Sequence, residues 1–246
     1  MTPHTLEVLR LLQNGEFRSG EMIGKTLGIT RGSVSNALAN IEDFGLTVHK
    51  VHGRGYRLLT PVQWLSRGEI LKQLGGQSTR FEIEVVDETG STNSDLLERA
   101  AQGASTGTVL VAELQTRGRG RRGRDWYSGL GGGLTFSALW RFEQGAGFLS
   151  GLSLAVGIAL ARVLRVNGTK DVMLKWPNDV LWRHLKLAGI LIELAGEVMG
   201  PTVAVIGVGI NLRLPEPVKA RIDQPVVDLA KIGIEVDRNR LFAEIL

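Results

Sequence analysis

The 246-residue chain has no cysteine, so neither disulfide bonds nor thiolate metal sites are available to it. It has only four histidines, and all but one of them precede residue 53. No histidine therefore stands with a carboxylate and a serine in a pattern typical of a hydrolytic triad. The apolar stretch 147–161 is too short to span a bilayer, and nothing at the start resembles a signal peptide. We expect a cytoplasmic protein with no membrane partner.

The sequence also has little net charge. Its formal charge of +4 is modest, and much of the local excess lies in one loop, so composition alone does not establish a nucleic-acid partner. Hydrophobic residues make up 43% of the chain, which is enough for a real core. The length leaves room for one large domain and one small one. We expect a globular protein whose chemistry has to be inferred from its motifs.

The most informative segment is the run of residues 117–124, in which five arginines are mixed with three glycines and which Trp126 follows closely. Five like charges this close repel one another, so an anion is expected between them. Arginine donates paired hydrogen bonds that match carboxylate and phosphate groups, and glycine lets the backbone approach a ligand closely. The pattern predicts a loop that encloses an anion, although a solvated basic turn fits the same run of charge.

A second alternative for this run is dinucleotide binding, because Gly118, Gly120 and Gly123 fit the pattern G-x-G-x-x-G. A Rossmann turn must open a helix whose N-terminus faces the pyrophosphate. The sequence continues instead to three consecutive glycines at 131–133, which no helix tolerates well. Side-chain charge would then have to hold any phosphate.

Residues 1–63 are predicted to form a winged helix-turn-helix domain. Apolar residues recur at helical spacing in three segments, with Ser19 and Thr30 as N-caps of the second and third helices, which end near Gly28 and Gly45. Two short strands, 46–51 and 56–59, then flank a turn at 53–55, which is typical of a wing. A plain three-helix packing module has the same periodicity and stays an alternative.

The outer face of the third helix is the predicted DNA contact of this domain. Residues 1–60 carry seven basic and five acidic residues, so charge decides little. So few phosphate contacts predict weak binding by one copy, and specific binding would need two copies on paired half-sites. The predicted DNA-contacting residues, the last of them in the wing turn, are Arg31, Ser33, Ser35, Asn36 and Arg54.

Residues 64–246 are predicted to form a larger domain, which places the chain in the α+β class. Ser91, Thr92 and Asn93 begin a helix, and the apolar helix after Ser150 is expected to be buried nearly all round against a sheet. The later strands are joined by turns too short for helical crossovers, so the sheet is expected to be mixed and mainly antiparallel. The predicted strands lie near 81–85, 109–114, 134–140, 172–176, 180–183, 187–195 and 202–210.

Further polar groups at strand ends are expected to converge on the arginine-rich loop. The segment 175–179 (KWPND) places a cation, an amide and a carboxylate at a strand end, and Lys186 begins the strand that continues LAGI. In isolation, a simple turn explains the first segment and a surface lysine explains the second. Together with the loop, these residues indicate phosphate chemistry.

Taken together, the motifs resemble those of the biotin protein ligases. The resemblance rests on Gln115, GRGRRG at 118–123, Trp126, KWPND at 175–179 and KLAGI at 186–190, in this order and at matching separations. With its N-terminal domain, the chain resembles the bifunctional members that also repress biotin genes.

This resemblance implies an enzyme that joins biotin and ATP into biotinyl-5′-adenylate, releases pyrophosphate, and passes biotin to a lysine of a biotin carboxyl carrier protein. It also implies a homodimer that forms on adenylate binding, with the adenylate as co-repressor, and binds operator DNA. The cofactors implied are ATP, biotin and Mg²⁺.

The resemblance also implies roles for individual residues. Arg121 and Lys186 would be catalytic, because they would stabilise the charge that builds at the phosphate. Asn178 and Asp179 would lie near Mg²⁺, with Lys175 in the same neighbourhood. The residues that would hold biotin or its adenylate are Ser91, Thr92, Asn93, Gln115, Gly118, Arg119, Gly120, Arg121, Trp126, Lys186 and Gly189.

Two departures from the family pattern stand out. Arg117 takes a place where the family often has a small residue, and segment 240–246 begins an amphipathic helix that stops without a capping signal. Because the family continues into a small C-terminal β domain, the sequence predicts a C-terminally truncated chain with weaker ATP binding and poor biotin transfer. Two rival functions stay open, namely lipoate ligation and a DNA-binding regulator that senses biotin without catalysis.

Overall fold

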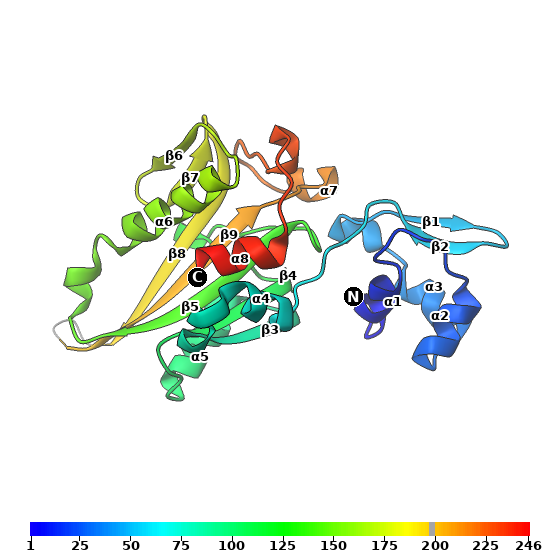
Figure 1. Ribbon diagram of the computed structural model, residues 1–246, viewed down its shortest axis with the longest axis horizontal. Helices are drawn as coiled ribbons and strands as arrows, with labels where there is room; N and C mark the ends of the chain where they lie inside the picture. The colour runs from blue at the N-terminus through cyan, green and yellow to red at the C-terminus, as the bar shows by residue number, and fades with distance from the viewer. Residues whose placement is uncertain (197–199) are drawn as a thin grey trace.

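The N-terminal domain has three helices followed by a two-stranded hairpin (Figure 1). The protein is described by a computed structural model over residues 1–196 and 200–246. The elements of the first domain are α1 (Thr5–Leu11), α2 (Gly20–Leu27), α3 (Arg31–Ala37), the 3-10 turn η1 (Ile41–Phe44), β1 (Val48–Val51) and β2 (Gly55–Leu58). Since β1 and β2 pair in antiparallel fashion, the predicted winged helix-turn-helix arrangement is present.

The caps of these helices lie where the sequence predicts them. Ser19 Oγ and Thr30 Oγ1 each accept a hydrogen bond from the amide three residues later, and Gly28 ends α2 with a φ of 68°. The third helix is shorter than predicted. Asn40 adopts a left-handed conformation with a φ of 58°, which separates α3 from η1.

A seven-stranded sheet in the order β3-β4-β5-β9-β8-β7-β6 forms the centre of the second domain. Among the described strands, β3 and β4 are parallel and the other neighbouring pairs are antiparallel. The prediction of an α+β fold with a mixed, mainly antiparallel sheet is confirmed. The strands are β3 (Glu82–Thr89), β4 (Thr108–Gln115), β5 (Gly133–Phe142), β6 (Val172–Lys175), β7 (Asp179–Trp182), β8 (Leu185–Gly196) and β9 (Thr202–Asn211).

The two faces of this sheet pack against different helices. In β4, Val109 and Val111 belong to the main core, which includes residues of α4, α6 and α8, whereas Leu110 between them packs with α5. This alternation follows from the period of two along a strand. The helices and remaining 3-10 turns are α4 (Arg67–Leu74), η2 (Gly75–Arg80), α5 (Thr92–Ala101), η3 (Arg121–Gly123), η4 (Ala146–Leu149), α6 (Leu152–Val166), α7 (Glu216–Lys219), η5 (Ala230–Ile232) and α8 (Arg238–Ile245).

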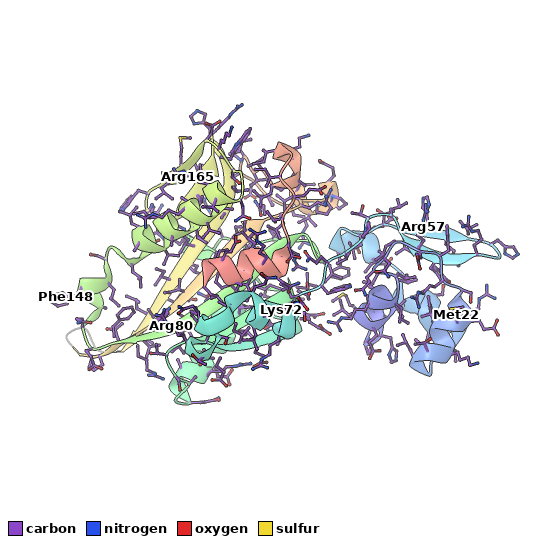
Figure 2. All side chains as sticks on the ribbon, viewed as in Figure 1. Met22, Arg57, Lys72, Arg80, Phe148 and Arg165 are labelled. Carbon is purple, nitrogen blue, oxygen red and sulfur yellow. The ribbon has the colours of Figure 1, made fainter. Side chains whose placement is uncertain are left out.

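The prediction that α6 is buried nearly all round is wrong. Four of its residues are buried against the sheet, while Leu154 and Val166 are exposed, the latter by 80%. Phe148, just before the helix, also points outward at the far end of the domain (Figure 2). A helix that crosses one face of a sheet buries one side only. Among the described residues, Ala146–Val166 is the one segment whose length and composition alone would allow a membrane span, a test that core helices of soluble proteins also pass.

A buried ion pair holds the segment that joins the two domains. Arg238 Nη1 at the start of α8 donates to Glu113 Oε2 of β4 at 2.8 Å, and the two side chains are 4% and 0% exposed. Arg238 also donates to the carbonyl of Gln63, and the Leu65 amide donates to Glu113. The linker therefore runs between β4 and α8, in the region where the boundary between residues 63 and 64 is predicted; that boundary itself stays a prediction.

Candidate active site

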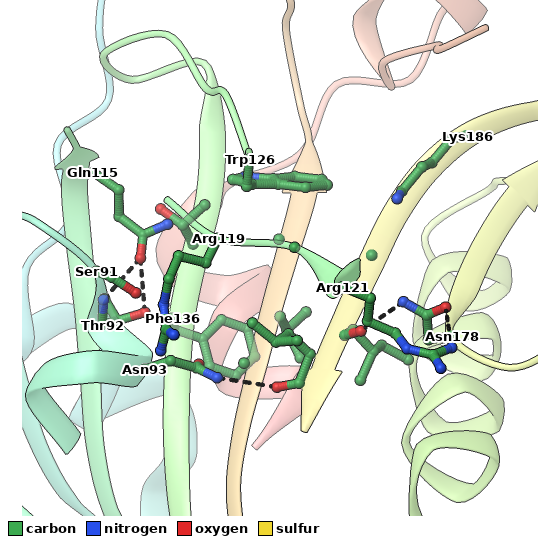
Figure 3. A pocket seen from close by; sticks show the side chains of 18 residues that line it. Ser91, Thr92, Asn93, Gln115, Arg119, Arg121, Trp126, Phe136, Asn178 and Lys186 are labelled. Atoms are coloured by element: carbon green, nitrogen blue, oxygen red, sulfur yellow. Dashed lines mark hydrogen bonds between the residues drawn. The ribbon is translucent and has the colours of Figure 1, made fainter. Parts of the chain in front are cut away.

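The candidate site lies on the α5 face of the sheet, at rows where the strands carry glycine. Thr135, Gly209 and Gly189 lie side by side on β5, β9 and β8, and Gly207 stands in the next row of the same face. A Cβ on Gly207 would collide with Asn93 Oδ1, so only glycine lets that side chain lie on the strand. The missing side chains leave a hollow that forms one wall of a pocket (Figure 3).

The N-terminus of α5 supplies the polar end of this pocket. Thr92 donates a hydrogen bond from its amide to Gln115 Oε1 at 2.8 Å, and its hydroxyl oxygen lies 3.0 Å from the same oxygen. Asn93 Nδ2 donates to the Leu191 carbonyl at 3.1 Å, and Asn93 Oδ1 accepts from Ser137 Oγ at 2.5 Å. Thr92 and Asn93 are almost completely buried. These polar groups satisfy one another and carry no net charge of their own.

The arginine-rich loop is folded as a narrow hairpin over the pocket. The Trp126 amide donates to the Gly118 carbonyl at 2.8 Å, and the Gly120 amide donates to the Arg124 carbonyl at 2.7 Å. At the tip, Arg122 has a left-handed φ of 58°. These backbone bonds fix which side chains of the loop can face the sheet.

Two guanidinium groups of the loop line the pocket, not all five. Arg119 Nη2 donates to Glu193 Oε2 at 2.7 Å, and Arg121 Nη1 donates to Asn178 Oδ1 at 3.2 Å. The other three arginines lie outside the pocket lining. The prediction that five clustered charges enclose one anion was too broad, because the hairpin geometry turns most of them away. Arg121 faces a neutral amide and so keeps its charge available to a ligand.

Trp126 covers the hollow in the sheet. A Cβ on Gly209 would collide with its indole ring, and a Cβ on Gly189 would lie 3.2 Å from Trp126 Cζ3. Figure 3 shows the ring lying across β9. The cavity that is left has a volume of about 50 Å³, whereas ligand pockets usually measure about 300–1,000 Å³. The Trp126 ring must therefore move outward to admit an organic ligand.

A β-bulge directs Lys186 toward the pocket. Leu187 and Ala188 are consecutive in β8, yet both are buried in the main core. The register between β7 and β8 shifts at this point, and Lys186 lies opposite Leu181. The extra residue returns Lys186 to the α5 face, which it shares with Asp179. Lys186 Nζ lies 2.9 Å from Asp179 Oδ1 and 5.7 Å from the centre of the Trp126 ring.

The structure gathers nearly all of the predicted site residues. Every residue predicted to hold biotin or its adenylate lines the pocket except Gly118, and Asn178 lines it as well. Gly118 is buried beneath the hairpin, where a Cβ would lie 2.5 Å from the Trp126 carbonyl. Lys175 and Asp179 line a neighbouring shallow cavity. Asp179 does not line the pocket itself but forms an ion pair with Lys186, which does. Their roles stay predictions.

Sequence reasoning missed several residues of the site. The alternating glycines 207 and 209 in a strand of β-branched residues were the signal that could have been used, since glycine inside a strand often marks a close approach. Ser137 and Glu193 had no local signal, because their roles depend on pairing between distant strands. The pocket-lining residues that were not predicted are Thr135, Phe136, Ile190, Leu191, Gly207, Val208 and Gly209.

A second cavity, of about 660 Å³, lies behind the loop and includes Phe44 of the N-terminal domain. There Tyr127 Oη donates to Asp125 Oδ2 at 2.9 Å, and Arg221 stacks on the tyrosine ring at 4.4 Å. The hydrogen bond to Asp125 raises the pKa of the Tyr127 phenol, because the carboxylate favours the protonated form. This cavity is larger, but nearly all of the predicted site residues line the first pocket, which is therefore the better candidate.

The predicted DNA-contacting residues lie on α3 and in the turn between β1 and β2. Arg31 and Asn36 of α3 are exposed, and the hydroxyl of Ser33 lies 2.9 Å from the capping hydroxyl of Thr30. In the turn of the wing, Arg54 stacks on the ring of Phe17 at 4.2 Å. Ser35 is half-buried. The arrangement presents polar groups at the start of the recognition helix, and contact with DNA stays a prediction.

Two family models match the chain. Residues 83–211 match the model described as the biotin/lipoate A/B protein ligase family, and residues 4–57 match a helix-turn-helix domain. The chain is 42% identical over 241 residues to the bifunctional ligase/repressor BirA of Escherichia coli strain K12, covering 98% of this chain and 74% of the relative. It is 41% identical over 181 residues to a biotin--[acetyl-CoA-carboxylase] ligase of Mycobacterium tuberculosis, covering 70% of this chain and 64% of the relative.

A solved structure of similar fold is the biotin protein ligase from Aquifex aeolicus in complex with biotin and ATP. It matches with a TM-score of 0.55 and 34% identity, over 67% of this chain and 66% of that chain. The fold and the site thus define a protein in which a ligase domain follows a helix-turn-helix domain in the sequence. The chain belongs to the biotin protein ligase family, among the members of bifunctional ligase/repressor type. It spans about three quarters of the length of its Escherichia coli relative.

Proposed function

We propose that this protein joins biotin and ATP into biotinyl-5′-adenylate and then transfers biotin to a lysine of a carboxylase carrier protein. The observation that carries the proposal is the polarity of the pocket. One end, at Thr92, Asn93 and Gln115, is hydrogen-bonded and neutral, while the other end holds Arg121 and Lys186. Biotin has the same polarity, since its ring urea is neutral and its carboxylate is the group that reacts.

In the first step the biotin carboxylate attacks the α-phosphate of ATP, an oxygen–phosphorus bond forms, and pyrophosphate leaves. Both reactants are anions and repel each other, so cationic groups have to offset this repulsion while holding them in reacting distance. Arg121, whose partner Asn178 is neutral, and Lys186 would do so. In the second step the lysine amine of the carrier attacks the mixed anhydride, an amide bond forms, and AMP leaves.

The same proposal includes Mg²⁺. Among the residues that the structure describes, no group of three or more His, Cys, Asp or Glu side chains is arranged to hold a metal. Mg²⁺ in nucleotide sites uses one or two carboxylates together with the phosphates of its substrate, so Asp179 with Asn178 fits that pattern. When bound with ATP, the ion neutralises phosphate charge. Asp179 would then pair with Mg²⁺ in place of Lys186, and the Lys186 ammonium would be free to interact with the phosphate.

We further propose that the N-terminal domain binds operator DNA as part of a cytoplasmic homodimer that forms when the adenylate is bound. The helix-turn-helix match and the exposed Arg31 and Asn36 support this part. One copy has few basic residues, so two copies on paired half-sites would be required for specific binding.

The test is biotin-dependent exchange of labelled pyrophosphate into ATP, with lipoate as the competing acid. The proposal expects exchange with biotin and none above background with lipoate. Exchange with lipoate alone would support lipoate ligation. Tight biotin binding without exchange would support a regulator that senses biotin without catalysis. A second assay, retention of labelled biotin on a purified carrier domain, tests the transfer step.

A further inference from the structure

A directional chain of hydrogen bonds crosses the floor of the pocket. Asn93 Nδ2 donates to the Leu191 carbonyl and to Glu193, so Asn93 Oδ1 must accept, and Ser137 uses its one hydroxyl proton there. Thr92 Oγ1 lies 2.7 Å from Ser137 Oγ, and its proton has to point to Ser137. The amide proton of Thr92 serves Gln115. From the Thr92 hydroxyl onward, every proton in the chain then points toward Glu193, where the negative charge lies.

Glu193 is also the partner of the loop. Its Oε2 accepts from Asn93 Nδ2 at 2.9 Å and from Arg119 Nη2 at 2.7 Å. The Glu193 side chain is 25% exposed, while that of Arg119 is 43% exposed. Since a hydrogen bond between two charged groups is stronger than one with a neutral partner, this contact is expected to be a stronger link than the Arg121–Asn178 bond.

The two ends of this chain lie close together in the sequence. The hydrogen-bond chain begins at Gln115, the last residue of β4, and ends at Arg119, which is four residues later in the sequence. Glu193 itself is on β8, opposite Val205 of β9 within a continuous antiparallel ladder. The first residues of the loop are thus held by β4 at Gln115 and by β8 at Arg119. This restraint reduces the number of conformations that the loop can adopt before a ligand binds.

We propose that Glu193 is a positioning residue of the biotin site. Its carboxylate holds the Arg119 guanidinium against Asn93 and so fixes the first half of the 117–126 loop over the pocket. The charge of Arg119 is neutralised by this contact, whereas Arg121 keeps its charge for the reacting anions. Arg119 thus serves as a wall of the pocket. The proposal rests on the proposed function only in taking biotin as the ligand.

The experiment compares Glu193→Gln, Glu193→Asp and the unchanged chain. Amide hydrogen exchange of residues 117–126 is measured without biotin, and the Kd for biotin is measured by calorimetry. We expect Glu193→Gln to speed exchange in the loop and to weaken biotin binding by about 10- to 100-fold, the range for losing one charged hydrogen bond. Glu193→Asp keeps the charge, so its loop protection and its biotin affinity should both lie between those of Glu193→Gln and the unchanged chain. The KM for biotin should change more than kcat.

The matched control is Glu84→Gln, which removes the carboxylate of another Arg–Glu pair. Glu84 accepts hydrogen bonds from Arg99 on the surface, away from the pocket, and those bonds lower the pKa of its carboxyl. This variant should leave loop exchange and biotin affinity unchanged. In an Arg119→Gln background, Glu193→Gln should have almost no further effect, because its partner is already gone.

Loop exchange and biotin affinity that stay unchanged in Glu193→Gln would overturn the proposal. An equal effect of Glu193→Gln with and without Arg119 would also overturn it, since Glu193 would then act through the fold in general. If the unchanged chain does not bind biotin, the proposed function fails, yet loop exchange still decides whether Glu193 holds Arg119.

Discussion

Lys186 Nζ lies 2.9 Å from Asp179 Oδ1, and their side chains are 15% and 19% exposed. The ammonium group that would stabilise a phosphate is thus already paired with a carboxylate. A partly buried cation without a partner is costly, so the pair keeps the site stable before substrates arrive. Binding of an anionic substrate then exchanges one partner for another.

Replacement of Asp179 tests this exchange. In Asp179→Asn the amide still reaches Lys186 but cannot offset its charge or help to hold Mg²⁺. We expect kcat for pyrophosphate exchange to fall by about tenfold or more, with a higher Mg²⁺ requirement and little change in biotin affinity. Asp171→Asn, which removes the exposed partner of Arg183, is the control and should behave as the unchanged chain does. Equal Mg²⁺ dependence in both variants would contradict the assignment.

Loss of the Lys186 ammonium should separate binding from chemistry. We expect Lys186→Ala to lower the rate of adenylate formation by about 100-fold or more, because a charge that acts mainly in the transition state is gone. Biotin binding, measured by calorimetry, should be kept within a few-fold. The exposed Lys72→Ala serves as control. Equal losses in affinity and rate would mean that Lys186 only helps to bind biotin.

A methyl group on Gly209 should displace Trp126. The new Cβ would collide with the indole ring, so the ring and the loop would have to shift. Because the proposed biotin ring also lies against Gly209, the methyl group would overpack the complex as well, at a cost of about 1–3 kcal/mol. This predicts a Kd for biotin raised roughly tenfold or more and altered tryptophan fluorescence. Gly76→Ala, where a Cβ meets nothing within 4 Å, is the matched control. Unchanged affinity would show that Trp126 does not shape the pocket.

The buried Glu113–Arg238 pair should matter for stability. Arg238→Met leaves the Glu113 carboxylate buried without a cationic partner, and we expect unfolding in urea to become easier by about 3–5 kcal/mol. Breaking the surface pair with Arg99→Gln should cost less than about 1 kcal/mol. If both variants unfold alike, the linker is held by packing and not by this pair.

The phenol of Tyr127 should ionise at a higher pH than an unperturbed tyrosine. Its hydrogen bond to Asp125 raises the pKa, and Asp125→Asn should return the absorbance transition near 295 nm toward lower pH. Because the folded pKa is raised, the contact contributes stability below the ordinary tyrosine pKa of about 10 and loses it as the pH rises through the folded pKa. The chain has one other tyrosine, so the titration is readable. A transition unmoved by Asp125→Asn would contradict this contact.

Much of the fold could be predicted because its signals are local. The caps at Ser19 and Thr30 each involve residues within one helical turn. The alternation of apolar and polar residues along a strand similarly depends on that strand alone, since it follows which face is buried. The helix α6 shows the limit of such reasoning, since Leu154 is apolar and exposed. The composition of a helix does not determine how many of its faces pack against other elements.

The site was predicted less completely for a physical reason. Residues on the loop and in the KWPND segment carry charge or special backbone geometry, and those types stand out in a sequence. Lys186 reaches the pocket only because a bulge at Leu187 reverses its face, and no local pattern reports a register shift. Glu193 joins the site through Asn93 and Arg119, which lie about 100 and 74 positions away. Such contacts exist only after the sheet has formed.

A crystal structure of this chain with biotin and a non-hydrolysable ATP analogue tests the central claim most directly. The account predicts that the biotin ring system lies against Gly207 and Gly209 near Asn93, with its carboxylate and the α-phosphate between Arg121 and Lys186, and with Trp126 moved outward. Biotin bound in the cavity beside Phe44 and Arg221, or bound with its carboxylate toward Asn93, would contradict it.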